Sequence, residues 1–203
     1  MEIKIIFAVL ASICGTIGFF PYLWNSLFGK TRPHAFTWLI WMITSGVAVT
    51  GLWFGGGGIG SIPSTISLIF VAAVFLVSLR FGKKDIKRSD IIALIAALSA
   101  IFIWWQLDSP VLAVVLVSII DVIGYIPTFR KSFKEPWTET ISSWGLFALA
   151  SIFAILALEE YNLMTLSYLA SISFVNTALL IFLFIRRKTI TKQSNPPSAH
   201  NGL

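Results

Sequence analysis

One acidic residue lies deep inside an apolar stretch of this chain, where a charge needs a functional or structural reason. Asp121 follows Pro110 by 11 residues, which is about 16 Å along a helix axis and close to the middle of a bilayer. A charge at that depth costs a few kcal/mol, so Asp121 is expected to face a cavity or a partner. Two interpretations follow: substrate binding or proton coupling, and a structural carboxyl hydrogen-bonded to a neighbouring helix.

A polar patch and two deep tryptophans complete the candidate site. Asn176, with Ser173 beside it in sequence, offers an amide that donates and accepts hydrogen bonds, as hydroxyl-rich solutes require. Interhelical hydrogen bonding is the alternative. Trp41 and Trp144 lie too deep for interfacial anchors, so they either sandwich a planar or sugar-like ligand or pack in the core. Together with Asp121, these residues form the predicted substrate-binding set.

Two Gly-x-x-Pro motifs predict places where helices bend. Gly18 and Pro21 lie in the first apolar run, and Gly124 and Pro127 lie in the fifth. Proline removes a backbone donor and clashes with the carbonyl one turn earlier, which bends the helix. The pair is interpreted as hinges of a gate, with fixed kinks as the alternative.

Other kinds of chemistry find little support. The sequence has no nucleophile–base pair and no cluster of metal ligands, so neither an enzyme, a metal site nor a cofactor is expected. The single cysteine, Cys14, excludes an intramolecular disulfide framework. The glycines at 55–58 lack the Lys-Ser/Thr of a phosphate-binding loop and are interpreted as a turn.

The composition predicts an all-α integral membrane protein. Of the 203 residues, 57% are hydrophobic and 12% are charged, and the mean hydropathy is +0.86. Soluble domains carry about twice that share of charge. The net charge of +6 is distributed between apolar runs, so it indicates membrane orientation and not nucleic-acid binding.

Seven apolar runs are long enough to cross a bilayer, which needs about 20 residues each. They cover residues 5–28, 35–54, 62–80, 90–107, 111–129, 137–158 and 163–185. Fourteen of the 15 Lys and Arg residues lie on one side of these runs, and only Lys4 lies on the other. Basic connections stay in the cytoplasm, so the N-terminus is predicted outside and the C-terminus inside.

An internal repeat organises these runs. The offset is 106 residues from Gly18 to Gly124 and from Pro21 to Pro127, and 103 residues from Trp41 to Trp144. This predicts two parallel three-helix bundles joined by a linker helix, an architecture typical of transporters with a site between the halves. The predicted divisions are 1–82 (first repeat), 83–109 (linker helix), 110–188 (second repeat) and 189–203 (a disordered cytoplasmic tail).

The paired Gly-x-x-Pro motifs, the 3+1+3 plan and the outside N-terminus resemble the PQ-loop/SWEET superfamily of membrane transporters, as a divergent member. Tyr22 and Thr128 replace the glutamine of that family's Pro-Gln pair. The resemblance implies a sugar pocket in which Trp41, Trp144 and Asn176 match lining residues. Phe70 stands at the repeat position of Asn176.

These observations predict a transporter of a small polar solute, sugar-like or another small metabolite, that alternates access between the two bundles. A receptor or sorting protein on the same scaffold is the alternative. The expected partners are a small-molecule substrate and the lipid bilayer, without nucleic acid, as a monomer or a homo-oligomer. The expected location is the bacterial inner membrane.

Overall fold

The computed structural model describes residues 2–82, 86–107 and 109–191, and its secondary-structure elements in these ranges are all helices. They are α1 (Glu2–Leu27), α2 (Ala35–Phe54), α3 (Ile62–Phe81), α4 (Arg88–Leu107), α5 (Pro110–Gly124), α6 (Ile126–Lys134), α7 (Ile141–Ala157) and α8 (Leu163–Thr189), with the short 3-10 helices η1 (Gly58–Ser61) and η2 (Pro136–Thr138). Because α5 and α6 form one segment interrupted at Tyr125, the described chain has seven helical segments. The all-helical prediction is confirmed.

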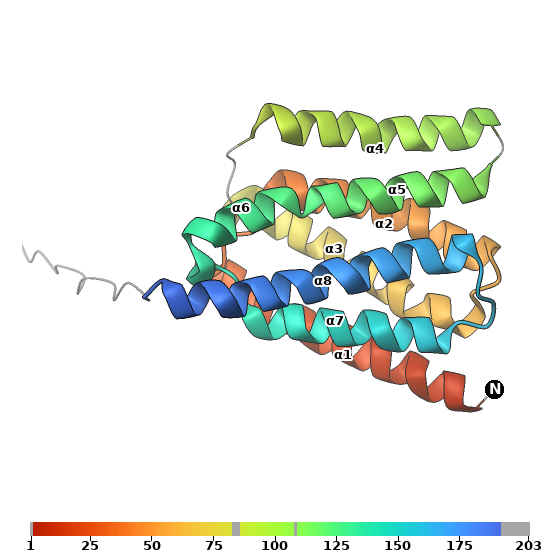
Figure 1. Cartoon of the computed structure of the whole chain (residues 1–203), viewed down its shortest axis with the longest axis horizontal. Helices are drawn as coiled ribbons and strands as arrows, with labels where there is room; N and C mark the ends of the chain where they lie inside the picture. Colours follow the sequence, from red (N-terminus) through yellow and green to blue (C-terminus); the bar gives the residue numbers. More distant parts are fainter. Residues whose placement is uncertain (1, 83–85, 108, 192–203) are drawn as a thin grey trace, which may run out of the picture.

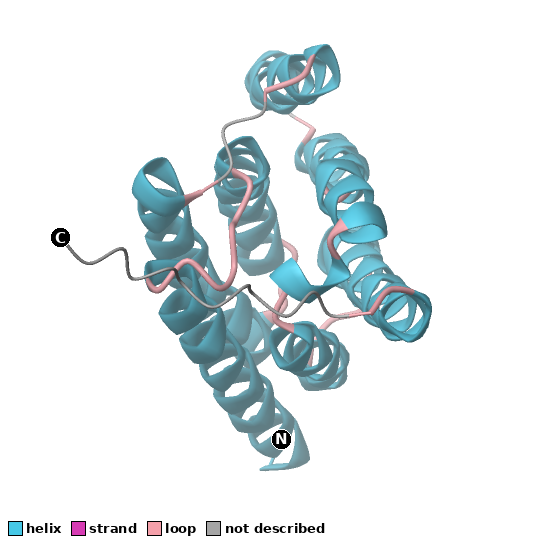
Figure 2. Cartoon of the chain, turned by 90° about the vertical axis from the view of Figure 1, so that its left-hand side faces the viewer, coloured by secondary structure: helices cyan, strands magenta, loops and turns pink. Residues whose placement is uncertain are grey.

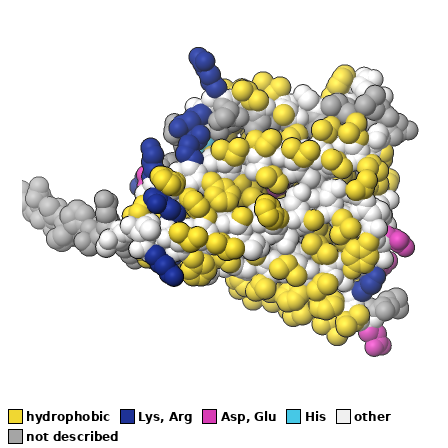
Figure 3. Space-filling model, in the orientation of Figure 1, with side chains coloured by type: hydrophobic (Ala, Val, Ile, Leu, Met, Phe, Trp, Pro, Cys, Tyr) yellow, Lys and Arg dark blue, Asp and Glu magenta, His cyan; other side chains and the backbone are white. Residues whose placement is uncertain are grey.

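The helices identify an integral membrane protein. Five segments are long and apolar enough to cross a membrane: Glu2–Leu27, Ala35–Phe54, Gly58–Phe81, Pro110–Lys134 and Leu163–Thr189. Large apolar side chains cover the outside of the molecule, among them Phe54 and Phe174, each 74% exposed (Figure 3). A water-soluble protein rarely exposes so many large apolar side chains, whereas lipid tails cover them without cost.

The helices run side by side in a single bundle (Figures 1 and 2). Helix α1 packs against α3 and α7, and α5 packs against α8 and α2. Helix α3 also contacts α2, and α8 also contacts α7. Helix α4 lies at the edge of the bundle, where it contacts α5 and α2.

Two of the predicted runs differ from the observed helices. The run 111–129 is divided into α5 and α6 just before Pro127, which has no N–H to donate to the carbonyl of Ile123. A turn at Tyr125 interrupts the regular helical hydrogen bonds, and the N–H of Tyr125 bonds to the carbonyl of Val122. The run 137–158 begins as η2, and α7 starts only at Ile141, which leaves 17 helical residues.

The two ends of the bundle carry different charges (Figure 3). At one end, Lys131 bonds to the carbonyl of Arg32 and Arg186 bonds to that of Phe133. We call this the basic end. At the opposite end, Lys4 donates to the carbonyl of Glu159, and Glu160 follows directly.

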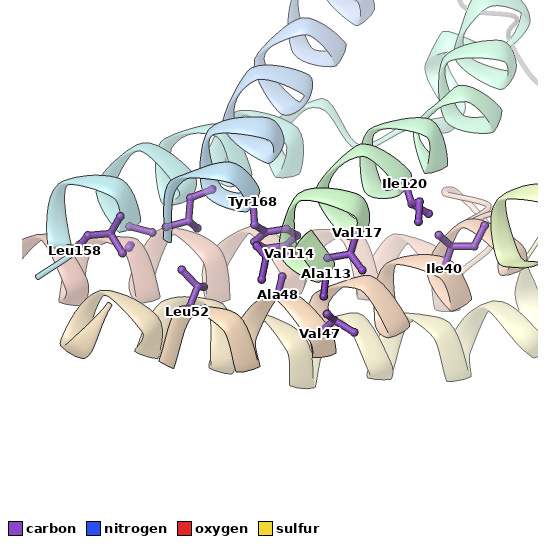
Figure 4. Close-up of a cluster of buried hydrophobic side chains, with 13 residues drawn as sticks. Ile40, Val47, Ala48, Leu52, Ala113, Val114, Val117, Ile120, Leu158 and Tyr168 are labelled. Carbon is purple, nitrogen blue, oxygen red and sulfur yellow. The ribbon is translucent and has the colours of Figure 1, made fainter. Parts of the chain in front are cut away.

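A hydrophobic core joins α2, α5, α7 and α8 towards the opposite end (Figure 4). Gly51 on α2 allows a close approach to α5, since a Cβ there would overlap the side chain of Val114. Leu52 and Leu158 are fully buried where the η1 turn meets the end of α7. This core holds the helices that wall the site described next.

Candidate functional site

A cavity of about 100 Å³ lies inside the bundle, between α1, α2, α3, α5, α7 and α8. Four residues of the predicted substrate-binding set line it: Trp41, Asp121, Trp144 and Asn176. The structure thus brings together side chains that lie up to 135 residues apart in sequence.

Ser173 does not share that cavity. It lines a separate groove on the outer side of α8, beside Phe174 and Thr177. Three residues along a helix correspond to a rotation of about 60° from the starting direction. Asn176 therefore reaches the interior while Ser173, three positions earlier, is directed to the next face.

Asp121 connects α5 to α2 and also lines the cavity. Its side chain is buried, and Oδ1 accepts a hydrogen bond of 2.6 Å from the hydroxyl of Thr44. The indole Nε1 of Trp41 donates to the main-chain carbonyl of Asp121 at 3.2 Å. The hydrogen bond expected of a structural carboxyl is therefore present, but it engages only one of the two carboxylate oxygens.

Two further polar pairs cross the cavity wall. The hydroxyl of Tyr125 donates to Oδ1 of Asn176 at 2.6 Å, which joins the end of α5 to α8. Ser45 and Tyr168 are 3.0 Å apart, which joins α2 to α8. The pairing of Tyr125 leaves the amide NH₂ of Asn176 as the free half of that side chain within the described chain.

Aromatic rings close the cavity towards the basic end. The ring centroids of Trp41 and Tyr125 are 4.4 Å apart, and those of Tyr125 and Trp144 are 5.9 Å apart. Trp41 and Trp144 meet edge to face, with centroids 6.2 Å apart and an interplanar angle of 73°. In this structure the two indoles pack against each other, as in the core-packing alternative, and a ligand held between them stays a prediction.

A buried acid at the basic end escaped the sequence analysis. Glu139, between η2 and α7, is 3% exposed and pairs with Lys131 of α6. Its Oε2 accepts from the indole Nε1 of Trp144 at 3.0 Å, and Arg187 of α8 donates to its main-chain carbonyl. The sequence gives no warning of this burial, because Glu139 lies in a polar connection.

Some of the other lining residues could have been predicted from their helical spacing in the sequence. Trp38 and Ser45 continue the helical stripe of Trp41 on α2. Tyr168 lies about two turns before Asn176 on α8. Its spacing therefore predicts that it shares a helix face with Asn176.

The predicted hinge residues lie at close helix contacts. A Cβ on Gly18 would lie 2.9 Å from the ring of Phe147 on α7, and one on Gly124 would lie 2.9 Å from Nε1 of Trp41 on α2. Pro21 lies within the unbroken α1, whereas Pro127 lies in the first turn of α6, after the turn at Tyr125. The two motifs therefore share their glycine packing and differ at the proline.

Among the residues that the structure describes, no group of three or more His, Cys, Asp or Glu side chains is arranged to hold a metal ion. Comparisons with protein-family models, with curated proteins and with solved structures found no match.

Proposed function

We propose that this protein is a membrane transporter for a small polar solute, sugar-like or another small metabolite. The observation that carries the proposal is the cavity within the bundle, with polar groups from α2, α5 and α8 in its wall. Polar and ionisable groups are costly inside a membrane, and they commonly mark the path of a substrate or ion.

The packing of the helices supports two equivalent bundles. Helices α1, α2 and α3 would form the first, and α5–α6, α7 and α8 the second, with α4 as the linker. In each bundle the third helix contacts the first and the second. Between the bundles the contacts are reciprocal, α1 with α7 and α5 with α2. This pattern is what an internal duplication would produce, and it agrees with the proposed relationship to the PQ-loop/SWEET superfamily.

Alternating access requires a closure at each end of the cavity that can open separately. At the basic end, Thr140 bonds to Thr31 at 2.7 Å and to Asn25 at 3.2 Å, next to the Lys131–Glu139 pair. At the opposite end, Asn162 of the α7–α8 connection donates to the carbonyl of Gly55 at 2.8 Å. Both closures are made of hydrogen bonds, so each can open by breaking polar contacts.

The charge distribution supports an orientation. We place the basic end in the cytoplasm and the N-terminus outside, since basic connections are retained on the cytoplasmic side. The bacterial inner membrane is the proposed location. In that orientation the rings of Trp41, Tyr125 and Trp144 lie between the cavity and the cytoplasm.

Entry of solutes into proteoliposomes tests the proposal. Stopped-flow light scattering would follow vesicles after mixing with concentrated sugars, amino acids or amines, because a permeant solute reverses the initial shrinkage. Saturable entry of at least one class is expected. Ala150→Phe should block entry, because Ala150 lines the cavity. Ala170→Phe is the matched control, since Ala170 lies in the outer groove of α8.

Two results would count against transport. The first is that every solute enters proteoliposomes no faster than it enters vesicles without protein. The second is that Ala150→Phe leaves the rate of entry unchanged. Ligand binding without entry would favour the alternative function, a receptor or sorting protein that uses the same cavity.

A further inference from the structure

The cavity has one formal charge on its wall, and that charge has no counter-ion. Asp121 is 2% exposed, and no Lys, Arg or His lines the cavity. Within the described part of the chain, its carboxylate accepts one hydrogen bond, from Thr44, and Oδ2 has no partner. A carboxylate in this position loses its hydration without receiving a compensating charge.

The second buried acid of the described chain, Glu139, has a basic partner, whereas Asp121 has none. Glu139 is equally buried, yet it is paired with Lys131 and also accepts the indole N–H of Trp144. The fold therefore supplies a cation to the acid at the basic end and none to the acid in the cavity. A cation that pairs with Asp121 would therefore have to enter from outside the chain.

The aromatic residues of the wall provide a second feature that favours positive charge. Trp41, Tyr125 and Trp144 lie around the floor, and Phe19 and Phe147, with centroids 4.6 Å apart, continue the wall on α1 and α7. The faces of such rings carry negative electrostatic potential, which attracts ammonium groups when water is excluded. An anion would find neither a basic side chain nor favourable ring faces there.

Several hydrogen-bonding groups of the wall are already engaged within the protein, whereas the hydroxyls of Ser64 and Ser67 also line the cavity. The indole N–H groups of Trp41 and Trp144 donate to main-chain and side-chain oxygens of the protein. Tyr125 bonds to Asn176, and Ser45 pairs with Tyr168. Among the groups that remain for a ligand, which include the hydroxyls of Ser64 and Ser67 and the amide NH₂ of Asn176, the free carboxylate oxygen of Asp121 is the strongest acceptor.

From these observations we infer that the cavity takes a small organic cation, a protonated amine or a quaternary ammonium, with Asp121 as its counter-charge and the aromatic rings as its wall. The inference rests on the proposed function, in that it specifies the solute class for the same cavity. The volume of about 100 Å³ favours a compact cation, since sites for drug-sized ligands usually have about 300–1,000 Å³. The Asn176 amide would serve a hydroxyl or carbonyl group on such a cation.

Binding to the purified full-length protein in detergent tests this inference without any need for transport. The probes are choline and its uncharged isostere 3,3-dimethylbutan-1-ol, with tetramethylammonium, ethylammonium, glucose and sodium chloride, at constant ionic strength. Tryptophan fluorescence and the thermal unfolding midpoint would both report binding, because Trp38, Trp41 and Trp144 line the cavity. At least one organic cation should bind ten-fold or more tightly than the isostere and glucose.

The variant Asp121→Asn should abolish the preference for the cation over its isostere. Asparagine keeps an oxygen to accept from Thr44, so the fold should be retained, and the unfolding midpoint without ligand checks this. Ser173→Ala is the matched control on α8, outside the cavity, and should keep the preference. The comparison of choline with its isostere on the unaltered protein stands even if Asp121→Asn does not fold.

Four results would overturn the inference: equal binding of cation and isostere, tighter binding of glucose, a response reproduced by sodium alone, or no saturable binding of any organic cation. Failure of this inference is distinguishable from failure of the transport proposal. Binding of a cation without entry into vesicles contradicts transport only, and entry of a neutral solute that leaves cations unbound contradicts the cation class only.

Discussion

The indole of Trp144 donates to the carboxylate of Glu139 across 3.0 Å, which ties a wall of the cavity to the ion pair at the basic end. Glu139 thereby contacts two elements at once, Lys131 on α6 and Trp144 on α7. A ligand that displaces the indole would disturb the closure, and an opening of the closure would free the indole. This contact gives the proposed transporter a direct route from an occupied cavity to its basic end.

Replacement of Glu139 by glutamine is expected to weaken this closure. Glu139→Gln keeps an acceptor for the indole but leaves the buried Lys131 without its counter-charge, which should lower the free energy of unfolding by about 3 kcal/mol. Chemical denaturation in detergent measures the change. Lys134→Gln is the control, because Lys134 is exposed on the same helix and should change stability by less than about 0.5 kcal/mol.

The double variant Glu139→Gln with Lys131→Met measures how much the ion pair itself contributes to the free energy of unfolding. The double variant should be more stable than the sum of the two single changes predicts, since it removes both charges. Strict additivity would contradict a coupled pair.

The glycine at the end of α5 is expected to be required for packing against α2. A methyl group in Gly124→Ala would lie 2.9 Å from Nε1 of Trp41, so the variant should lose about 1–3 kcal/mol of stability. Gly46→Ala is the matched control in α2, with nothing within 4 Å of the added methyl group, and it should gain about 0.5–1 kcal/mol from helix propensity. Unfolding experiments on both variants measure the difference. Equal effects of the two changes would refute the packing argument.

The two prolines are expected to differ in their effect on transport. Pro127→Ala restores a backbone N–H at position 127, so α5 and α6 should join into one straighter helix and solute entry should slow several-fold. Pro21→Ala should change the entry rate less, because α1 is already continuous through that position. Initial rates of entry into proteoliposomes measure both. A larger effect at Pro21 would contradict a hinge at the α5–α6 break.

The proposed orientation predicts which end reagents reach from outside. In a Cys14→Ser background, which removes the single cysteine, Glu160→Cys at the opposite end should react with a membrane-impermeant maleimide in intact cells. Lys30→Cys, in the connection between α1 and α2, should react only after permeabilisation. Both positions are exposed, so accessibility within the protein does not limit the comparison. The reverse labelling pattern would place the N-terminus in the cytoplasm.

Several helices follow from the sequence almost to the residue. The run 35–54 is α2, and the runs 62–80 and 163–185 lie within α3 and α8. The division of the fifth segment was harder to predict, because a proline inside an apolar run is compatible with a continuous helix such as α1 and also with the turn before α6. Which one forms depends on packing at that depth.

The sequence by itself determined that this is a helical membrane protein with a basic end, because apolar length and charge placement are local properties that each segment carries alone. It also singled out Asp121, since an acid is conspicuous in an apolar run. Only the tertiary structure decided that Asn176 faces the cavity while Ser173 faces outward, and that Trp41 meets Trp144 edge to face. Only the fold paired Glu139 with Lys131 and left Asp121 unpaired. Such choices depend on the rotation and crossing of whole helices, which are set by contacts between residues far apart in the chain.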